Sequence, residues 1–77
     1  MAVAAYILIQ TEVGRTNVAR EIAAIDGVTS AEGVNGPYDV IARAEAETVD
    51  DLGRMVVGQV QLVEGIRRTI TCPVVHL

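Results

Sequence analysis

The spacing of apolar residues divides the chain into strand-like and helix-like segments. Ala2–Gln10 is apolar at both alternating sets of positions, which predicts a strand covered on both faces. From about Arg15 to Ile25, apolar residues recur at helical spacing opposite charged ones, which predicts an amphipathic helix. Asp26-Gly27 follows, and we expect Gly27 to end the helix in the left-handed conformation of a C-terminal cap.

Three further strands follow from alternation and from turn residues. Val28–Val34 contains several polar residues and predicts an edge strand. Tyr38–Glu45 predicts the next strand, after a turn, and Ile66–Val75 predicts the last one. Pro73 lies in the second half of that last strand, where it indicates an unpaired edge position or a bulge, because proline has no N–H for a strand ladder.

A second helix is predicted to start at Thr48, which forms a capping-box-like pattern with Asp51. Glu64-Gly65 is expected to end this helix. Apolar residues at helical spacing form its buried stripe, namely Leu52, Met55, Val56, Val60 and Val63.

The order of segments is therefore βαββαβ, two βαβ halves joined by a hairpin, which is the ferredoxin-like plan. A faint repeat supports two halves, because Ile25-Asp26-Gly27-Val28 and Val63-Glu64-Gly65-Ile66 both join a helix to a strand. Right-handed crossovers would place both helices on one face of a four-stranded antiparallel sheet, with strands one and three in the centre. We expect an α+β, ferredoxin-like fold that forms one domain over residues 1–77.

The face of the sheet opposite the helices also carries apolar residues. The first strand is apolar on both sides, and strand three adds Ile41 on the side opposite Val40 and Ala42. A chain this short buries only roughly 60% of its unfolded surface when alone, although 51% of its residues are hydrophobic. The pattern therefore predicts a homodimer in which two sheet faces share a core.

Charge and cysteine content exclude some partners. The six basic residues are all Arg, and ten acidic residues give a net charge of −4, which argues against direct DNA binding. A lone Cys72 excludes an internal disulfide and fits a reducing compartment. The N-terminal apolar run is too short to span a membrane and has no basic region before it. These features predict a cytoplasmic protein without membrane contact.

Residues suited to catalysis are few. There is no Lys, His76 is next to the C-terminus, and Cys72 lies in an aliphatic strand where a small core residue is the simpler interpretation. Cys72 and His76 are too few ligands for a structural zinc site, and no glycine-rich phosphate loop is present. We therefore expect no catalytic residue, no metal and no cofactor.

The turn Gly36-Pro37-Tyr38-Asp39 is the best candidate for polar recognition. It follows Asn35, and an Asn-Gly pair between two strands predicts a tight hairpin. In one interpretation Tyr38 covers a hydrophobic edge and Asp39 accepts hydrogen bonds from turn amides. In the other, turn N–H groups bind the carboxylate of an amino acid, Asp39 binds its ammonium group, and Tyr38 forms a wall.

Two threonines on the last strand are weaker candidates. Thr69 and Thr71 share one face of that strand with Arg67, and Arg68, Ile70 and Cys72 share the other. Threonine is a good strand former, so β propensity alone explains both residues. Alternatively, their hydroxyls bind a small polar ligand or a second subunit.

In this set of features the chain resembles the effector-binding (RAM) domain of the Lrp/AsnC, or feast/famine, transcriptional regulators. The resemblance covers almost the whole chain. Its residues are the apolar first strand, Asp26-Gly27-Val28, Gly36-Pro37-Tyr38-Asp39 (the family's Gly-x-Tyr/Phe-Asp), and Glu64-Gly65-Ile66 followed by Arg68-Thr69-Ile70-Thr71. No single motif is decisive, and the resemblance depends on the order and spacing of all of them.

The resemblance implies dimers built through the sheets, a further ring of four or five dimers (an octamer or decamer), and an amino-acid effector bound between dimers. By position, Gly36, Tyr38 and Asp39 would line that site, with Thr69 and Thr71 as weaker candidates. Full-length members carry an N-terminal helix-turn-helix domain, whereas the first strand here begins at Ala2, so the chain is similar to the stand-alone form.

Three functions remain open from the sequence. The first is an amino-acid-sensing and oligomerising module that modulates its own assembly or that of a full-length Lrp/AsnC regulator. The second is an assembly domain without a ligand. The third is a small enzyme on the same plan, because a fold does not determine a function.

Overall fold

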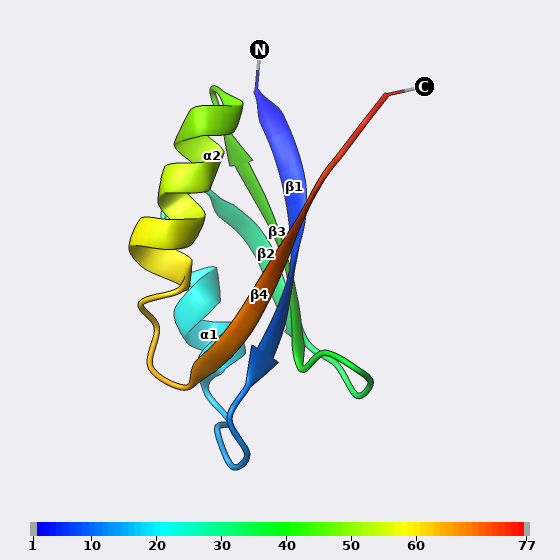
Figure 1. Ribbon diagram of the computed structural model, residues 1–77, viewed down its shortest axis with the longest axis vertical. Helices are drawn as coiled ribbons and strands as arrows, with labels where there is room; N and C mark the ends of the chain where they lie inside the picture. The colour runs from blue at the N-terminus through cyan, green and yellow to red at the C-terminus, as the bar shows by residue number, and fades with distance from the viewer. Residues whose placement is uncertain (1, 77) are drawn as a thin grey trace.

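The computed structural model describes residues 2–76 and shows a four-stranded antiparallel sheet with both helices on one face (Figure 1). The strand order is β2-β3-β1-β4, so the predicted ferredoxin-like plan with β1 and β3 in the centre is confirmed. In chain order the elements are β1 (Val3–Thr11), α1 (Val18–Ala23), β2 (Val28–Gly33), β3 (Val40–Ala46), α2 (Val49–Met55), a π-helical turn η1 (Val56–Val60) and β4 (Ile66–Pro73).

The hydrophobic core lies between the helices and one face of the sheet. Ala5, Ile7 and Ile9 alternate along β1 and are completely buried. Burying a side chain such as Ile7 contributes about 1.5–3 kcal/mol, so these alternating positions hold the helices on this face. The other strand and helix residues of the core are Val18, Ile22, Val40, Ala42, Ala44, Leu52, Met55, Val56 and Val60.

Helix α1 is shorter than predicted, because Val18–Ala23 is helical rather than about 15–25. Gly14 adopts a φ of 88° in the preceding loop, and Arg15 extends across the molecule to the chain before β4 instead of joining the helix. At the other end Gly27 has a φ of 96°, as its predicted capping role requires.

The second helix begins as predicted but does not remain an α-helix. The Thr48 hydroxyl accepts a hydrogen bond from the Asp51 N–H at 3.0 Å, while the Asp51 carboxylate binds Arg54 at 2.7 Å. After Met55 the backbone widens, and the Gln61 N–H donates to the Val56 carbonyl, five residues back. The predicted apolar stripe is buried at Leu52, Met55, Val56 and Val60 and partly buried at Val63.

The connection between β2 and β3 is a six-residue loop, so the predicted tight Asn-Gly turn is wrong. Such a turn would need a positive φ at Asn35 and Gly36, and neither residue has one. It would also need an N–H at the following position to close the turn, and Pro37 has none. The loop closes instead through the Val34 N–H and the Asp39 carbonyl at 2.8 Å.

Tyr38 and Asp39 consequently precede the third strand, which was predicted to start at Tyr38. The last strand ends at Pro73 and lies at an edge of the sheet, which is one of the two positions predicted from its proline. Cys72 is exposed, so its interpretation as a core residue was wrong. Among the described residues, no helix is long and apolar enough to cross a membrane.

Gly27 and Gly53 give opposite predictions for alanine. At Gly27 a Cβ would overlap the Met55 methyl group and require a left-handed backbone, so Gly27→Ala should lower the free energy of unfolding by about 1–2 kcal/mol or more. Gly53 is exposed on α2, and a Cβ added there would have no neighbour within 4 Å, so Gly53→Ala should raise the free energy of unfolding by about 1 kcal/mol. Urea denaturation measures both, and equal effects would contradict the assigned backbone conformations.

Candidate functional site

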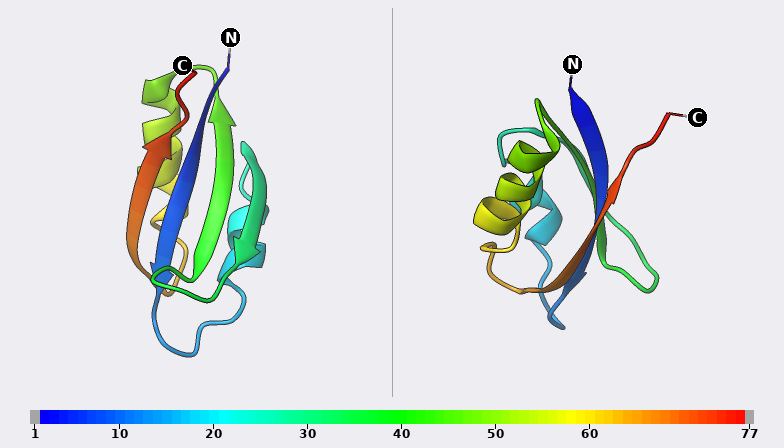
Figure 2. Two further views of the ribbon diagram at one scale, coloured as in Figure 1. Left: turned by 90° about the vertical axis from the view of Figure 1, so that its right-hand side faces the viewer. Right: turned by 45° about the horizontal axis from the view of Figure 1, so that its top comes forward.

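The loop between β2 and β3 folds over the end of β1 and is held there by its backbone. The Asp39 N–H donates to the Ile9 carbonyl at 2.9 Å, and the Asp39 carbonyl accepts from Val34. On the sheet face opposite the helices, the Gln10 side-chain amide donates to the Pro37 carbonyl at 3.0 Å. Figure 2 shows the loop crossing in front of the strands, on the side away from the helices.

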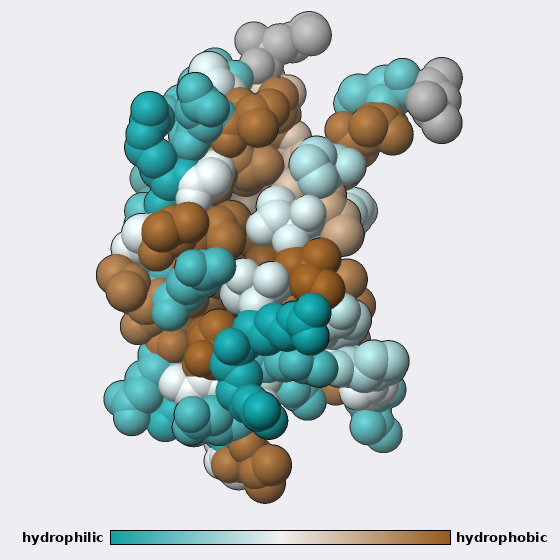
Figure 3. Space-filling model, in the orientation of Figure 1, coloured by the Kyte–Doolittle hydropathy of each residue, from teal (hydrophilic) through white to brown (hydrophobic). Residues whose placement is uncertain are grey.

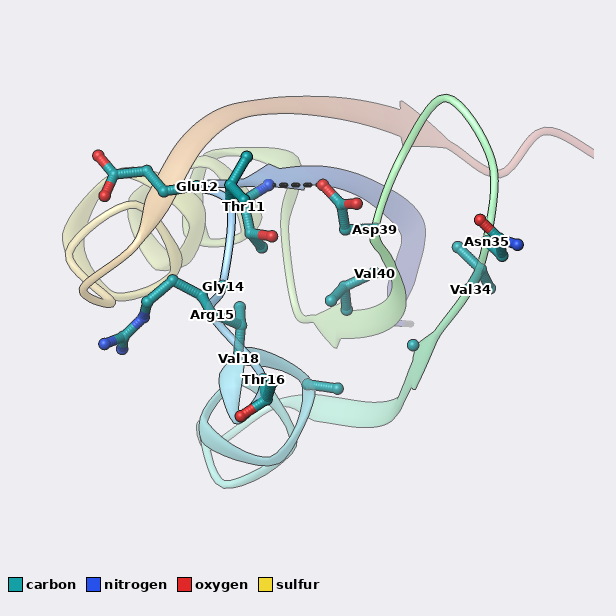
Figure 4. A pocket seen from close by; sticks show the side chains of 13 residues that line it. Thr11, Glu12, Gly14, Arg15, Thr16, Val18, Val34, Asn35, Asp39 and Val40 are labelled. Carbon is teal, nitrogen blue, oxygen red and sulfur yellow. Dashed lines mark hydrogen bonds between the residues drawn. The ribbon is translucent and has the colours of Figure 1, made fainter.

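The Asp39 carboxylate points back toward the loop that follows β1. Its Oδ2 accepts a hydrogen bond from the Thr11 N–H at 2.9 Å (Figure 4). Thr11 is the last residue of β1, where a register shift after Gln10 disturbs the ladder with β4. Asp39 thus satisfies a backbone N–H at the end of a central strand and joins two loops that are far apart in the sequence.

An open hollow of about 660 Å³ lies between these two loops, beside Asp39 (Figure 4). Val18 and Ala19 of α1 and Val40 of β3 give it apolar surface. Polar side chains come from both loops, and the remaining lining residues are Thr11, Glu12, Val13, Gly14, Arg15, Thr16, Gly33, Val34, Asn35 and Asp39.

The structure brings only part of the predicted site to this hollow. Of Gly36, Tyr38 and Asp39, Asp39 alone lines it. Gly36 is exposed with open space around it, and Tyr38 is half-buried. The polar recognition predicted for this loop therefore centres on the Asp39 carboxylate within one chain.

Thr69 and Thr71 lie on a different strand from Asp39. They pair with Ile9 and Ile7, so their side chains are on the helix side of edge strand β4. The Thr69 hydroxyl accepts a hydrogen bond from the Gln61 side-chain amide at 2.9 Å, which leaves its own proton free to donate. Strand β1 separates the threonines from Asp39, a distance of about two strand spacings, or ~10 Å.

Arg15 is a lining residue that sequence reasoning missed. Its Nη2 donates to the Glu64 carbonyl at 3.0 Å, and its side chain packs against Gly65. Glu21 is its weaker partner, with 3.8 Å between nitrogen and oxygen, and Nε is buried without a partner among the described residues. The signal available in the sequence was the glycine at position 65, because it has no side chain to obstruct the arginine. In the structure Gly65 has a φ of 93°.

The sheet face opposite the helices, called the open face below, carries large apolar side chains. Tyr6 is 45% exposed and Ile41 is 37% exposed, and Leu8 pairs with Ile41 on one side and with Ile70 of edge strand β4 on the other. Val57 of η1 and Val13 of the loop after β1 are also exposed. The space-filling view shows apolar surface over the helices and at the end of the molecule where this loop lies (Figure 3).

A charged pair, Arg43 and Glu45, shares the open face with these apolar residues. The Arg43 guanidinium donates a hydrogen bond to Glu45, and this hydrogen bond raises the pKa of Arg43. A second, longer hydrogen bond of 3.5 Å joins Arg43 to the Thr29 hydroxyl. In residues 2–76 no group of three or more His, Cys, Asp or Glu side chains is placed to hold a metal ion.

Comparison with known proteins identifies relatives of this arrangement. A family model described as the Lrp/AsnC ligand binding domain matches residues 4–76. The HTH-type transcriptional regulator PH1916 of Pyrococcus horikoshii is 30% identical over 71 residues, which cover 87% of this chain and 47% of the regulator. The chain therefore spans about half the length of the curated regulators that it matches.

Solved structures show the same fold. The crystal structure of FFRP-DM1 has a TM-score of 0.87 and 30% identity, covering 95% of this chain and 99% of that one. The transcriptional regulator NMB0573 of Neisseria meningitidis, solved as a complex with L-Met, has a TM-score of 0.79 at 15% identity, covering 96% of this chain and 50% of that one. At that identity the second likeness concerns the fold alone.

The hydrogen bond between Asp39 and Thr11 should be measurable at the Thr11 amide. Asp39→Ala removes the acceptor, so Thr11 should exchange its amide proton faster, with a loss of about 1 kcal/mol in the free energy of unfolding. Asn35→Ala is the matched control, because Asn35 lines the same hollow and makes no side-chain hydrogen bond among those described. Equal Thr11 exchange in both variants, measured by NMR, would show that the carboxylate does not hold the loop.

Proposed function

Because the chain belongs to the Lrp/AsnC ligand-binding domain family, we propose that it is a non-catalytic module that senses a small amino acid and controls assembly. The observation that supports this function best is the Asp39 carboxylate on the wall of an open hollow with apolar surface. The hollow, at about 660 Å³, is within the usual 300–1,000 Å³ of small-molecule sites.

The groups at the hollow match the parts of an amino acid. A carboxylate has about four acceptor positions, and Asp39 uses one of them for Thr11, so others remain for an ammonium group. Val18, Ala19 and Val40 suit an aliphatic side chain. A regulator that shares the fold was solved with L-Met, a ligand of this class, which supports the choice of an amino acid here.

Within one chain, the Thr16 hydroxyl and the Asn35 side-chain amide line the hollow and are donors for the ligand carboxylate. Thr69 and Thr71 could supply hydroxyl donors, but they lie beyond β1 at the opposite edge of the sheet. We assign them, with Gly36 and Tyr38, to a site completed between chains, where the loop of one chain meets the edge strand of another. This arrangement makes ligand affinity depend on assembly, and assembly depend on the ligand, to the same degree.

Assembly through the open face is the second part of the proposal. Tyr6, Leu8, Ile41 and Ile70 give this face an apolar surface that a second copy would cover, forming a homodimer. Dimers would then associate into a ring, an octamer or a decamer. A full-length Lrp/AsnC regulator is a further partner, and through it the module would affect DNA without contacting DNA directly.

The loop between β2 and β3 is suited to connect the two activities. Asp39 lines the hollow, whereas Pro37 is bound by Gln10 on the open face only two residues earlier. A ligand that draws the Asp39 carboxylate away from Thr11 would therefore strain a loop that also forms part of the docking surface. A ligand shifts an assembly equilibrium only if it interacts differently with the assembled and the separate chains, and this loop provides such a difference.

A purely structural role is the second candidate, and one observation favours it. Asp39 already has a hydrogen-bond partner in Thr11, so its carboxylate has a structural function without any ligand. A thermal-shift screen separates the two functions, because a ligand that binds the native state raises the melting temperature. If no amino acid raises it at millimolar concentration, the structural role is correct and the sensing role is not.

Asp39→Ala should abolish amino-acid binding while the dimer persists, since the residue lines the hollow and is not part of the apolar surface proposed for docking. Calorimetry against a panel of amino acids measures the loss, which should be at least tenfold in affinity, or about 1.4 kcal/mol. Glu12→Ala is the matched control, because Glu12 is a second carboxylate at the hollow with no side-chain hydrogen bond described. Undiminished affinity in Asp39→Ala, or equal loss in both variants, would remove Asp39 from the site.

Ile41→Lys should convert the dimer to a monomer. In the monomer the new ammonium group lies opposite Glu32 across the strands, so folding is expected to persist, whereas docking would have to desolvate the charge. Leu62→Lys is the control, because Leu62 is 75% exposed and follows η1 on the helix side. Light scattering at micromolar concentration should show monomer for the first variant and a dimer or a ring of dimers for the second, and a monomeric parent protein would refute docking through the open face.

A further inference from the structure

The open face is arranged in rows that alternate in chemical character. One row crosses the sheet through Ile41, Leu8 and Ile70, which pair directly in the strand register. The neighbouring row contains Arg43 beside Tyr6, and the row on the other side pairs Gln10 with Arg68. An apolar belt is therefore bordered by positive groups on both sides, inside a chain whose net charge is −4.

Of the two arginines in these border rows, Arg43 lies on a central strand and Arg68 on an edge strand. Arg43 is flanked by Tyr6 on β1 and Ser30 on β2, and only about a third of its side chain is exposed. Its Nη1 donates to Glu45 and to Thr29, and the Tyr6 side chain is a further polar neighbour, which together leave some of the five guanidinium N–H groups without a partner among the contacts described for residues 2–76. Donors that point out of a central strand remain for a molecule that covers the face.

A shallow hollow of about 190 Å³ adjoins Arg43 on this face. Tyr6, Val34 and Ile41 give it apolar surface, and Glu32 and Arg43 contribute charged groups. A purely apolar partner would bury Arg43 and Glu45 without supplying any new acceptor or donor, which is strongly unfavourable. The partner that fits must bring both charges with it.

A second copy of this chain meets that condition. In a two-fold pair the same patch faces itself, so each Arg43 can meet a carboxylate and each Glu45 can meet a guanidinium of the other copy. A partner that carried only positive or only negative groups would leave like charges facing one another, which costs several kcal/mol in typical interfaces. The presence of both signs within two residues of β3 therefore favours self-association.

We propose that the Arg43–Glu45 pair is the specificity determinant of the open face, restricting docking to a sheet that carries both charges in the same positions. The apolar belt supplies the attraction, and the pair decides which surfaces are accepted. This inference rests on the docking of two open faces proposed above. It predicts that this chain pairs with itself, or with a relative that retains both charges, in preference to other members of its fold.

Charge reversal tests the pair directly. Arg43→Glu replaces the pair by two carboxylates, and Glu45→Arg replaces it by two guanidinium groups, so each variant alone should dimerise at least tenfold more weakly than the parent. Mixed together, the two variants should form a heterodimer that matches the parent in stability, because every carboxylate again meets a guanidinium group. Native mass spectrometry of isotopically labelled chains measures both the homodimers and the heterodimer.

Controls distinguish specificity from net charge and from loss of folding. Arg20→Glu and Glu47→Arg change the net charge by the same amounts at exposed sites on α1 and after β3, and they should dimerise like the parent and mix randomly. The neutral double variant with Arg43→Gln and Glu45→Gln keeps polar side chains at both positions without a charge and should accept either charge variant equally. Circular dichroism verifies that each variant is folded.

The outcomes separate this inference from the one on which it rests. A monomeric parent protein would refute docking of the open face and, with it, the role of the pair. A dimeric parent whose charge variants dimerise equally well, or mix randomly, would leave the docking intact and refute the specificity role. Preferential heterodimers that also form between the Arg20 and Glu47 control variants would likewise overturn it, because net charge would then explain the preference.

Discussion

The constraint on which the structure depends is that two short helices cover only one face of a sheet whose central strand is apolar on both. Ala5, Ile7 and Ile9 are fully buried under the helices, while Tyr6 and Leu8, between them in the sequence, face the other way. A strand of this kind cannot satisfy both faces within one small chain. This architecture is the physical basis for the proposed assembly through the open face.

The loop between β2 and β3 turns this arrangement into a candidate sensor. Because Pro37 prevents a tight turn, the chain takes a longer path across the end of β1, and its two sides face different surfaces. The Asp39 carboxylate reaches the hollow beside α1, and the Pro37 carbonyl reaches Gln10 on the open face. One short segment thus contacts both the hollow proposed for a ligand and the face proposed for a second copy.

The order of elements and most of the core were predictable from the sequence, because period and turn residues are local signals. Gly27 is an example, since its place after a helical run was enough to predict its left-handed backbone. Helix lengths and the hollow were not predictable in this way. The hydrogen bond from Arg15 to Glu64 and that from Thr11 to Asp39 join residues 49 and 28 positions apart, and no periodic pattern records such contacts.

The measurement that tests the central claim most directly is an NMR titration of the assembled protein with a panel of single amino acids. If the hollow beside Asp39 is the sensing site, one or a few amino acids should shift the amide signals of Thr11, Asn35 and Asp39, saturating with concentration, while that of Gly53 on the outer surface of α2 remains unchanged. If no amino acid moves these signals, or if the shifts occur only at sites remote from the hollow, the account of this chain as an amino-acid sensor is contradicted.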